Sequence, residues 1–344
     1  MPEFLEMTLG ELVADMARKY PDDNMIKYTD REYERTWKEF NDECEVIARG
    51  FMALGLKKGD KISIWATNVP AWLLTFFGSA KMGGILVTVN TSYKHFELEY
   101  QLRQSDTNIL VLIDGFKGTS YIDIVNKLCP ELASSNPGDL KAAAFPELKS
   151  VIYAGDGECP AGMVDWQSLY TLAEQVPVEE FEAVRDSCEC REVVNFQYTS
   201  GTTGFPKGVM LTHYNILNNG LTIGDGMKLT HKDRFCICVP FFHCFGMVLS
   251  ILACVTHGTS MVPVDYFQPK KVMDAIVSEK CTAVNGVPTM FIAMLEHPDF
   301  DKYDFSLMRT GIMAGSPCPV KTMQDVNNKM HMNEVTIVFG QTES

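Results

Sequence analysis

The chain has 344 residues, of which 46% are hydrophobic and 22% charged, and its formal net charge is −14. This length is enough for two domains or one large one, and the composition is that of a globular protein with a substantial core. The negative charge argues against a nucleic-acid-binding protein, because phosphate backbones require a basic surface. Small anions remain candidate ligands, since a few backbone N–H groups and one or two cations suffice to bind them.

No targeting or membrane signal is evident in the sequence. The first 20 residues carry charges throughout and lack the apolar core of a secretory signal. The longest apolar stretches, at residues 71–80 and 245–255, are shorter than the ~20 residues that a membrane-spanning helix requires. Eleven cysteines without a regular spacing favour free thiols in a reducing compartment. We therefore expect a cytoplasmic protein with no transmembrane segment.

The first third of the chain alternates helices and strands. Residues 8–11 and 36–39 both have the Thr-x-x-Glu pattern of a capping box, which predicts a helix after each. The second helix is expected to end near Gly55. The elements predicted next are a strand at 61–66, a helix from about Pro70, a strand at 84–90, a helix at 97–104 and a strand at 108–114.

The same alternation returns after residue 230, with strands predicted at 235–239, 260–264, 281–287, 310–315 and 335–339. Strands separated by helices indicate βαβ units and parallel sheets. We therefore expect an α/β fold of two packed α/β subdomains with mostly parallel sheets. Their expected extents are about 58–215 for one and 1–57 plus 216–344 for the other. Residues 130–192 are expected to be irregular.

The stretch TSGTTGFPKG, at residues 199–208, predicts an anion-binding loop between two strands. Its glycines allow positive φ and let backbone N–H groups approach a ligand closely. Four hydroxyl side chains and Lys207 add donors and a positive charge. This combination suits a polyanion such as a triphosphate.

Two other glycine-rich loops are excluded by the residues around Lys207. A Walker A loop needs Gly-Lys-Ser/Thr leading into a helix, whereas here Pro206 precedes Lys207, and Gly208 and a strand follow. The pattern G-x-G-x-x-G of a dinucleotide-binding loop is absent. A plain surface turn is the remaining alternative, but it would need neither the lysine nor the hydroxyls.

The segment YTSGTTGFPKG resembles the phosphate-binding signature of the adenylate-forming superfamily, which includes acyl-CoA synthetases, peptide-synthetase adenylation domains and luciferases. Three further segments resemble motifs of this family in the same order: PFFHCFG (240–246), MAGSPCP (313–319) and FGQTE (339–343). The resemblance extends over essentially the whole chain. Residues 56–116 look most like fatty acyl-CoA ligases.

The resemblance implies an ATP, Mg²⁺ and coenzyme A-dependent ligase that converts a carboxylate to acyl-AMP and then to acyl-CoA. The phosphates would be bound by Thr199, Ser200, Gly201, Thr202, Thr203, Gly204 and Lys207. The rest of the nucleotide would contact Gly315, Ser316, Phe339, Gly340, Gln341 and Thr342. The acid would be bound by His243, Val287, Met290, Met313, Ala314 and Gly340. The catalytic residues would be Lys207, His243, Thr342 and Glu343, the last as the ligand of Mg²⁺.

Simpler interpretations exist for some of these residues. Cys236, Cys238, His243 and Cys244 could form a metal site, but cysteines two apart on a strand are more typical of packing thiols than of a structural zinc site. Without its motif, His243 could be an ordinary core histidine. Likewise, Glu343 could be a surface carboxylate near the end of the chain.

The substrate implied by the resemblance is an apolar acid of medium or longer chain, with an aryl acid as the alternative. Residues 242–244 contain no carboxylate to pair with an amino acid's ammonium group. Gly340 stands where acetate-specific relatives have a tryptophan that closes the pocket.

Members of this family continue beyond the Thr-Glu motif with an aspartate for the ribose, a hinge and a small domain that carries a catalytic lysine. We therefore expect this chain to be the large N-terminal part of an acyl-CoA synthetase, inactive by itself. A naturally short, non-catalytic nucleotide- or acyl-binding module is the alternative from another class. A phosphotransferase is disfavoured by the context of Lys207.

Overall fold

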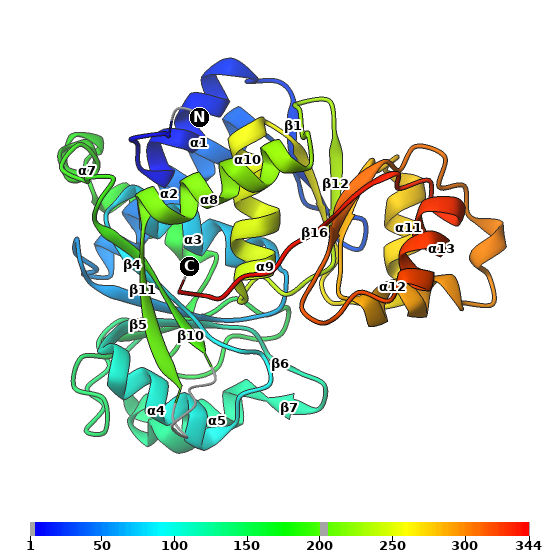
Figure 1. Ribbon diagram of the computed structural model, residues 1–344. Helices are drawn as coiled ribbons and strands as arrows, with labels where there is room; N and C mark the ends of the chain where they lie inside the picture. Colours follow the sequence, from blue (N-terminus) through cyan, green and yellow to red (C-terminus); the bar gives the residue numbers. More distant parts are fainter. Residues whose placement is uncertain (1–3, 200–205, 344) are drawn as a thin grey trace. The chain divides into compact units, whose positions relative to one another are not determined.

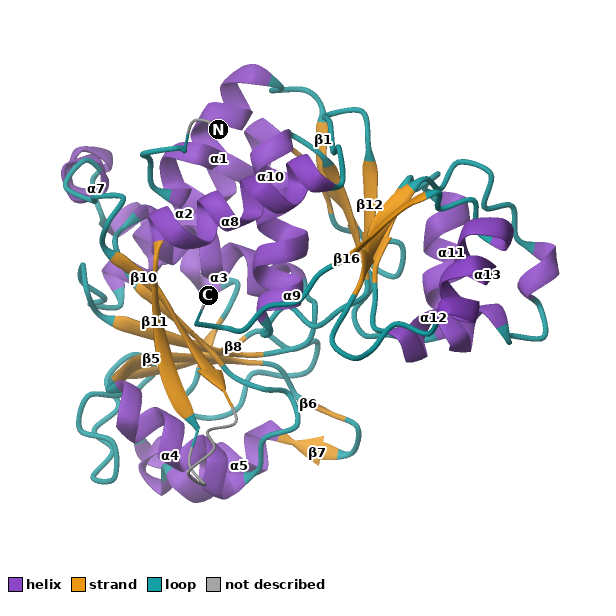
Figure 2. Cartoon of the chain, viewed as in Figure 1, coloured by secondary structure: helices purple, strands orange, loops and turns teal. Residues whose placement is uncertain are grey.

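A computed structural model describes residues 4–199 and 206–343. The chain divides into two compact units, the first of Met1–Leu5, Leu12–Phe40 and Ile216–Ser344 and the second of Glu6–Glu11 and Asn41–Asn215. Within the described residues, each unit contains a seven-stranded sheet with helices packed beside it (Figure 2). The expected α/β fold with mostly parallel sheets is confirmed.

The sheet of the first unit has the strand order β16-β15-β14-β12-β13-β1-β2. All neighbouring pairs are parallel except the antiparallel pair at one edge, β1 and β2. Its strands are β1 (Asn24–Lys27), β2 (Glu34–Thr36), β12 (Arg234–Ile237), β13 (Ser260–Pro263), β14 (Ala283–Asn285), β15 (Thr310–Met313) and β16 (Glu334–Ile337).

Helices cover the first unit's sheet and connect its parallel strands. The helices α11, α12 and α13 gather on one side of the sheet, while α1, α8 and α10 lie on the other (Figure 1). The bounds of these helices and of α9 are α1 (Leu9–Lys19), α8 (His213–Gly226), α9 (Cys244–Gly246), α10 (Ala253–His257), α11 (Pro269–Ser278), α12 (Pro288–Leu295) and α13 (Val320–Lys329). A π-helix, η3 (Met247–Leu252), joins α9 to α10.

The sheet of the second unit has the order β11-β10-β4-β3-β5-β8-β9 and is parallel except for the hairpin β10–β11. Its strands are β3 (Lys61–Trp65), β4 (Ile85–Thr88), β5 (Thr107–Leu112), β8 (Ser150–Tyr153), β9 (Val164–Asp165), β10 (Val193–Thr199) and β11 (Lys207–Thr212). A separate short ladder joins β6 (Gly115–Phe116) to β7 (Thr119–Ser120). The helices of this unit are α3 (Pro70–Lys81), α4 (His95–Ser105), α5 (Tyr121–Leu128), α6 (Ser168–Leu172) and α7 (Val178–Arg185). Most of α2 (Trp37–Ala53) also belongs to it.

Each unit has its own hydrophobic core. In the first unit, side chains of the sheet such as Cys236, Cys238 and Met313 pack with residues of α11 to α13, including Ile276 and Phe291. Both cysteines are buried, as expected of packing thiols. In the second unit the core forms between the sheet and the helices α4 and α5. Burying each large apolar side chain contributes about 1.5–3 kcal/mol, so these faces account for much of the stability of each unit.

Both predicted capping boxes are present. The Thr8 N–H donates to Glu11 Oε2 at 2.7 Å and the Glu11 N–H donates back to Thr8 Oγ1 at 3.1 Å. Thr36 and Glu39 exchange the same two bonds at 2.9 and 3.2 Å. These reciprocal bonds satisfy amide donors that the first turn of a helix leaves without partners.

The expectation that residues 130–192 are irregular is wrong in part. This stretch contains the buried strand β8, which pairs in parallel with β5, together with β9, α6 and α7. The strand is only four residues long and is bordered by glycine, proline and aspartate. Its parallel pairing with β5 makes it part of the second unit's sheet. No helix in the described ranges is both long and apolar enough to cross a membrane.

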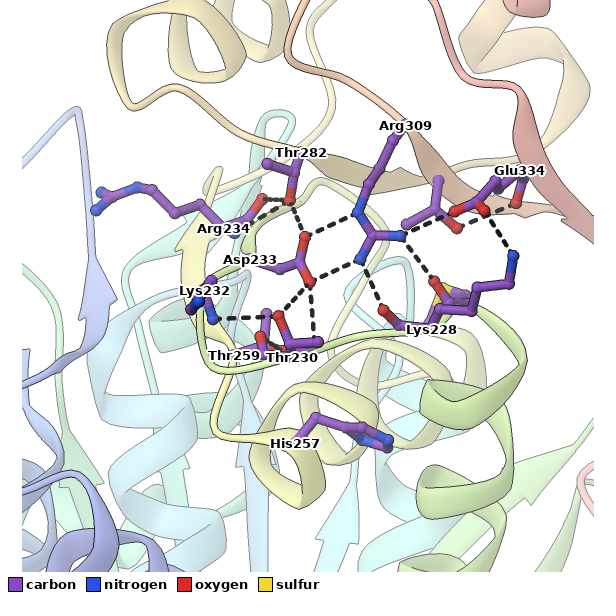
Figure 3. Close-up of polar contacts among 12 residues, drawn as sticks. Lys228, Thr230, Lys232, Asp233, Arg234, His257, Thr259, Thr282, Arg309 and Glu334 are labelled. Carbon is purple, nitrogen blue, oxygen red and sulfur yellow. Dashed lines mark hydrogen bonds and ion pairs between the residues drawn. The ribbon is translucent and has the colours of Figure 1, made fainter.

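A charged network ties together the amino ends of four strands of the first unit (Figure 3). Arg309, just before β15, donates to both carboxylate oxygens of Asp233, just before β12, at 3.1 and 2.7 Å. It also donates to Glu334, the first residue of β16, at 3.0 Å, and Thr282, just before β14, donates to Asp233 at 2.7 Å. Burial alone would raise the pKa of Asp233, but the bonds from Arg309 and Thr282 lower it below its usual range. Asp233 is therefore ionised and links the amino ends of β12, β14 and β15.

A second buried contact joins the start of α1 to the start of α8. His213 is 1% exposed, and its Nδ1 accepts the Leu9 N–H at 3.1 Å. Burial lowers the pKa of His213 to about 4. The unfolded chain would bind a proton at this residue near pH 6.5, so acidification favours the unfolded state. The stability contribution is complete above that pH and is lost as the pH falls toward 4.

We predict that replacing His213 by glutamine, which does not titrate, removes part of the acid sensitivity of the fold. Between pH 7 and pH 5 the unmodified protein should lose about 2 kcal/mol more free energy of unfolding than His213→Gln. Urea unfolding at the two pH values measures the difference. The exposed His331 offers a matched control as His331→Gln, whose pH dependence should follow the unmodified protein. Equal pH dependence in His213→Gln and the unmodified protein would contradict the assignment.

Candidate active site

The predicted motifs of the first unit meet at the carboxyl edge of its sheet. The strands β16, β15, β14 and β12 are consecutive neighbours and parallel. The segments that follow them contain, in this order, residues 339–343, 314–316, 287–290 and His243. Because neighbouring parallel strands end at the same edge, these segments are gathered there. In open α/β sheets this edge is where ligands bind.

The loops after β14 and β15 are in direct contact. Gly286 forms a bridge with Met313, and the Ala314 N–H donates to the Gly286 carbonyl at 3.3 Å. Gly315 has φ of +87°, and a Cβ at this position would lie 3.0 Å from Val287 Cγ1. Only glycine meets both constraints comfortably. The structure therefore brings together the predicted residues Val287, Met313, Ala314 and Gly315.

The exposure of these residues divides them into two groups. Met313 and Ala314 are buried, Met290 is half-buried, and Gly315 and Ser316 are exposed. The apolar members thus continue the core, while the glycine and serine lie at the surface. This gradient suits a ligand with an apolar part and a polar part.

His243 is held by its own backbone turn. It is the N-cap residue of α9, and its Nδ1 accepts the Phe245 N–H at 3.1 Å. The bond requires Nδ1 without a proton, so the neutral ring carries its hydrogen on Nε2. Burial by surrounding atoms lowers the pKa of His243, which favours this neutral form. The residue is nevertheless exposed to solvent, unlike a core histidine, so its Nε2–H can reach a ligand.

The final motif lies beside the same turn. The pKa of the Cys244 thiol is raised, mainly by burial. A hydrogen bond with the Thr342 side chain opposes this shift, and the Glu343 carboxylate adds to it. The Thr342 side chain therefore contacts the residue that follows His243, and Glu343 is the next residue in the chain. Three of the predicted catalytic residues, His243, Thr342 and Glu343, are therefore gathered in one place.

Residues 339–341, just before Thr342, are open to solvent. Phe339 is 96% exposed, and Gly340 and Gln341 are exposed as well. A Cβ at Gly340 would meet no described atom within 4 Å. The ring of Phe339 and the space beside Gly340 are therefore accessible to a ligand.

The predicted phosphate loop belongs to the second unit, between β10 and β11. Thr199 and Lys207 are paired across the hairpin at the two ends of this loop, and Lys207 is exposed. The predicted residues Ser200, Gly201, Thr202, Thr203 and Gly204 lie outside the described residues. In the described parts of the chain, no group of three or more His, Cys, Asp or Glu side chains is arranged to hold a metal ion. Glu343 is a single carboxylate and not part of such a group.

Sequence reasoning missed one residue that supports the site. Asn285, at the end of β14, is fully buried. Its Oδ1 accepts the Ile312 N–H at 2.7 Å, and its Nδ2 donates to the Leu249 carbonyl and to Ser250 Oγ, both at 3.0 Å. Ser250 in turn donates to the Phe245 carbonyl at 2.9 Å. Asn285 thus joins β15 to the π-helix that follows His243. The sequence indicates such a role only by placing a polar residue inside the apolar run CTAVNGV.

We predict that Asn285→Leu lowers the free energy of unfolding by on the order of 3 kcal/mol, because it leaves the Ile312 N–H and the Leu249 carbonyl buried without their partner. Urea unfolding at pH 7 measures the change. The control is Asn219→Leu, the same substitution at an exposed position of α8, which should change stability by less than about 0.5 kcal/mol. Equal stability of Asn285→Leu and the control would refute the bracing role.

Comparison with known proteins identifies relatives of the whole chain. The family model described as "AMP-binding enzyme" matches residues 13–344. YngI of Bacillus subtilis (strain 168), provisionally named an acyl-CoA synthetase, is 50% identical over 344 residues, which cover 100% of this chain and 62% of that protein. The medium-chain acyl-CoA ligase ACSF2, mitochondrial, of Danio rerio is 36% identical over 340 residues, 98% of this chain and 56% of that protein.

A solved structure agrees with the fold described above. The N-terminal domain of FACL13 from Mycobacterium tuberculosis, in an inhibitor-bound crystal structure, matches with a TM-score of 0.80 and 20% identity, over 98% of this chain and 77% of that chain. At this identity the likeness concerns the fold alone. The chain spans 62% of the length of the Bacillus subtilis relative and 56% of that of the Danio rerio relative.

Proposed function

The chain belongs to the family of AMP-binding enzymes, and on this premise we propose that it forms the ATP- and acid-binding part of an acyl-CoA synthetase. The observation that carries the proposal is the gathering of His243, Thr342 and Glu343 with the loops after β14 and β15 at one edge of the first unit's sheet. The acyl-CoA synthetase and ligase names of the relatives support the same reaction class.

In this proposal the nucleotide is bound by two sets of residues. The loop from Thr199 to Lys207 holds the β- and γ-phosphates, and Lys207 neutralises part of their charge. Gly315, Ser316 and Phe339 contact the adenine, and the exposed ring of Phe339 is suited to stacking on a base. Gln341 and Thr342 lie toward the α-phosphate.

Glu343 would hold Mg²⁺ together with the phosphates. It is exposed and adjacent to Thr342, and Mg²⁺ commonly takes only one or two protein carboxylates alongside phosphate oxygens and water. The residues present therefore fit this ion, which would supply charge neutralisation when bound.

The proposed reaction has two displacements. An oxygen of the substrate carboxylate bonds to the α-phosphorus and pyrophosphate leaves, and the CoA thiolate then bonds to the acyl carbon and AMP leaves. Both reactants of the first step are anions, so positioning and hydrogen-bond donation dominate catalysis. The neutral His243 can donate its Nε2–H to the substrate carboxylate, and the Thr342 hydroxyl can donate to the phosphate.

The proposed acid is apolar and of medium or longer chain. Val287, Met290 and Met313 offer an apolar lining, and Gly340 leaves space that a larger side chain would fill. The ACSF2 relative is named a medium-chain ligase, which supports this chain length. An aryl acid is the alternative substrate, and a non-catalytic nucleotide- or acyl-binding module is the alternative from another class.

We predict that Lys207→Ala weakens binding of Mg·ATP to the chain by about tenfold or more, because a hydrogen bond to a charged group contributes about 1.5–3 kcal/mol. Isothermal titration calorimetry measures the change. The exposed Lys141 in the same unit provides the control as Lys141→Ala, which should bind like the unmodified chain. Unchanged affinity in Lys207→Ala would exclude this loop as the phosphate site.

A second prediction concerns the acid and requires a full-length protein that contains this chain. Each buried methylene contributes about 0.8 kcal/mol, so kcat/KM should rise from acetate through hexanoate to decanoate and then level off. Gly340→Trp should reverse this order by filling the space beyond Gly340, while Gly226→Ala, at another glycine with open space around it, should not. Benzoate tests the aryl alternative.

Acetate as the best substrate of the unmodified protein would contradict the open-pocket interpretation of Gly340. The 344 residues assayed alone span only 62% and 56% of the two relatives described above. They should form acyl-CoA at least about 10²–10³-fold more slowly than the longer form, the loss typical of removing one group that stabilises the transition state. Absence of turnover in every form, with ATP binding retained, would favour the binding-module alternative.

A further inference from the structure

Two side chains of α4 contact the two ends of the predicted phosphate loop. The Tyr100 hydroxyl donates to the Pro206 carbonyl at 3.2 Å, just before Lys207. At the other end, just before Thr199, the Tyr198 hydroxyl is hydrogen-bonded to Gln104 Oε1. Tyr100 and Gln104 are four residues apart, so they lie on the same side of the helix. One helical turn of α4 therefore engages both strands of the hairpin where they enter the loop.

Gly208 makes room for this arrangement. A Cβ at this position would lie 3.2 Å from Tyr198 Cζ and 3.4 Å from Gln104 Oε1, with its nearest neighbours in the side chains of the Tyr198–Gln104 pair. Its backbone does not adopt positive φ. The glycine therefore leaves space beside Tyr198 and does not serve a left-handed backbone.

The helix α4 is itself firmly held. Leu98 and Leu102 are buried in the core of the second unit, and Gln101 Nε2 donates to the Thr88 carbonyl at 2.8 Å. Thr88 ends β4, which pairs with β10. The helix and the hairpin thus pack on the same sheet. The ladder pairs Thr199 with Lys207, and the contacts of Tyr100 and Gln104 hold both paired ends against α4.

We infer that Tyr100 and Gln104 are positioning residues for phosphate binding, which they serve by holding the ends of the loop so that Thr199 and Lys207 face a bound nucleotide. The inference rests on the proposed function of the loop. Its physical basis is preorganisation: ends that are fixed before the ligand arrives lose less conformational freedom on binding. Neither side chain needs to touch the nucleotide.

The test compares Mg·ATP affinity and amide hydrogen exchange in single variants of the chain. Tyr100→Phe removes one hydroxyl and is expected to weaken ATP binding by about 3- to 10-fold, the effect of one net hydrogen bond. Gly208→Ala crowds the Tyr198–Gln104 pair, which would have to shift by a few tenths of an ångström, and should also weaken binding. In both variants, amides of β10 and β11 next to the loop should exchange faster without ligand, while the midpoint of thermal unfolding changes little.

Matched controls remove the same groups elsewhere. Tyr170→Phe deletes a hydroxyl that is bonded to Glu43 in the same unit, and Gly226→Ala adds a methyl group where no described atom lies within 4 Å. Both should bind Mg·ATP like the unmodified chain. Lys207→Ala is measured alongside to establish whether the loop binds phosphate.

The outcomes separate the two hypotheses. Weaker binding and faster exchange in Tyr100→Phe and Gly208→Ala, with unchanged controls, would support the positioning role. Unchanged binding in Tyr100→Phe together with weaker binding in Lys207→Ala would overturn the positioning role and leave the loop as the phosphate site. Failure of the unmodified chain to bind Mg·ATP, or unchanged binding in Lys207→Ala, would overturn the proposed function of the loop and the inference with it.

Discussion

The ion pair between Asp233 and Arg309 fixes the part of the first unit on which the candidate site depends. It lies at the amino ends of β12 and β15, and through Thr282 and Glu334 it includes β14 and β16. These strands have only three or four residues, so they are about 10–13 Å long. A displacement at the amino edge would therefore be transmitted almost directly to the carboxyl edge, where His243, Gly315 and Thr342 lie. Loss of either charged partner would also leave the other without its main compensation.

The two edges of this sheet are stabilised by different chemistry, and the difference suits the proposed ligands. Charged groups hold the amino edge, whereas the neutral amide of Asn285 holds the carboxyl edge with three hydrogen bonds. A buried carboxylate at position 285 would place a negative charge close to the residues proposed to bind a carboxylate and a triphosphate. Like charges disfavour each other most where solvent is excluded. A neutral, fully hydrogen-bonded brace avoids this cost.

Local sequence patterns predicted the parts of the structure that depend on local interactions. The capping boxes at Thr8 and Thr36, the alternation of strands and helices and the hairpin around Lys207 all involve residues near one another in the chain. The strand β8 and the roles of Asn285 and Gly208 depend on partners far away, such as β5, Leu249 and Gln104. The motifs identified candidate residues, but only the strand order β16-β15-β14-β12 brings three of these motifs and residues 287–290 to one edge.

The overall charge of −14 sets a further constraint on a protein proposed to bind ATP and a carboxylate. A net negative field opposes the approach of anions, so attraction has to come from groups close to the ligand. The chain offers exposed Lys207 at one end of the loop, Nε2–H of the neutral His243, and the hydroxyl of Thr342. Neutral donors keep their strength in a partly desolvated site and require no counter-ion there. If the proposed function holds, the anions are therefore attracted by local donors such as these and not by the general surface charge.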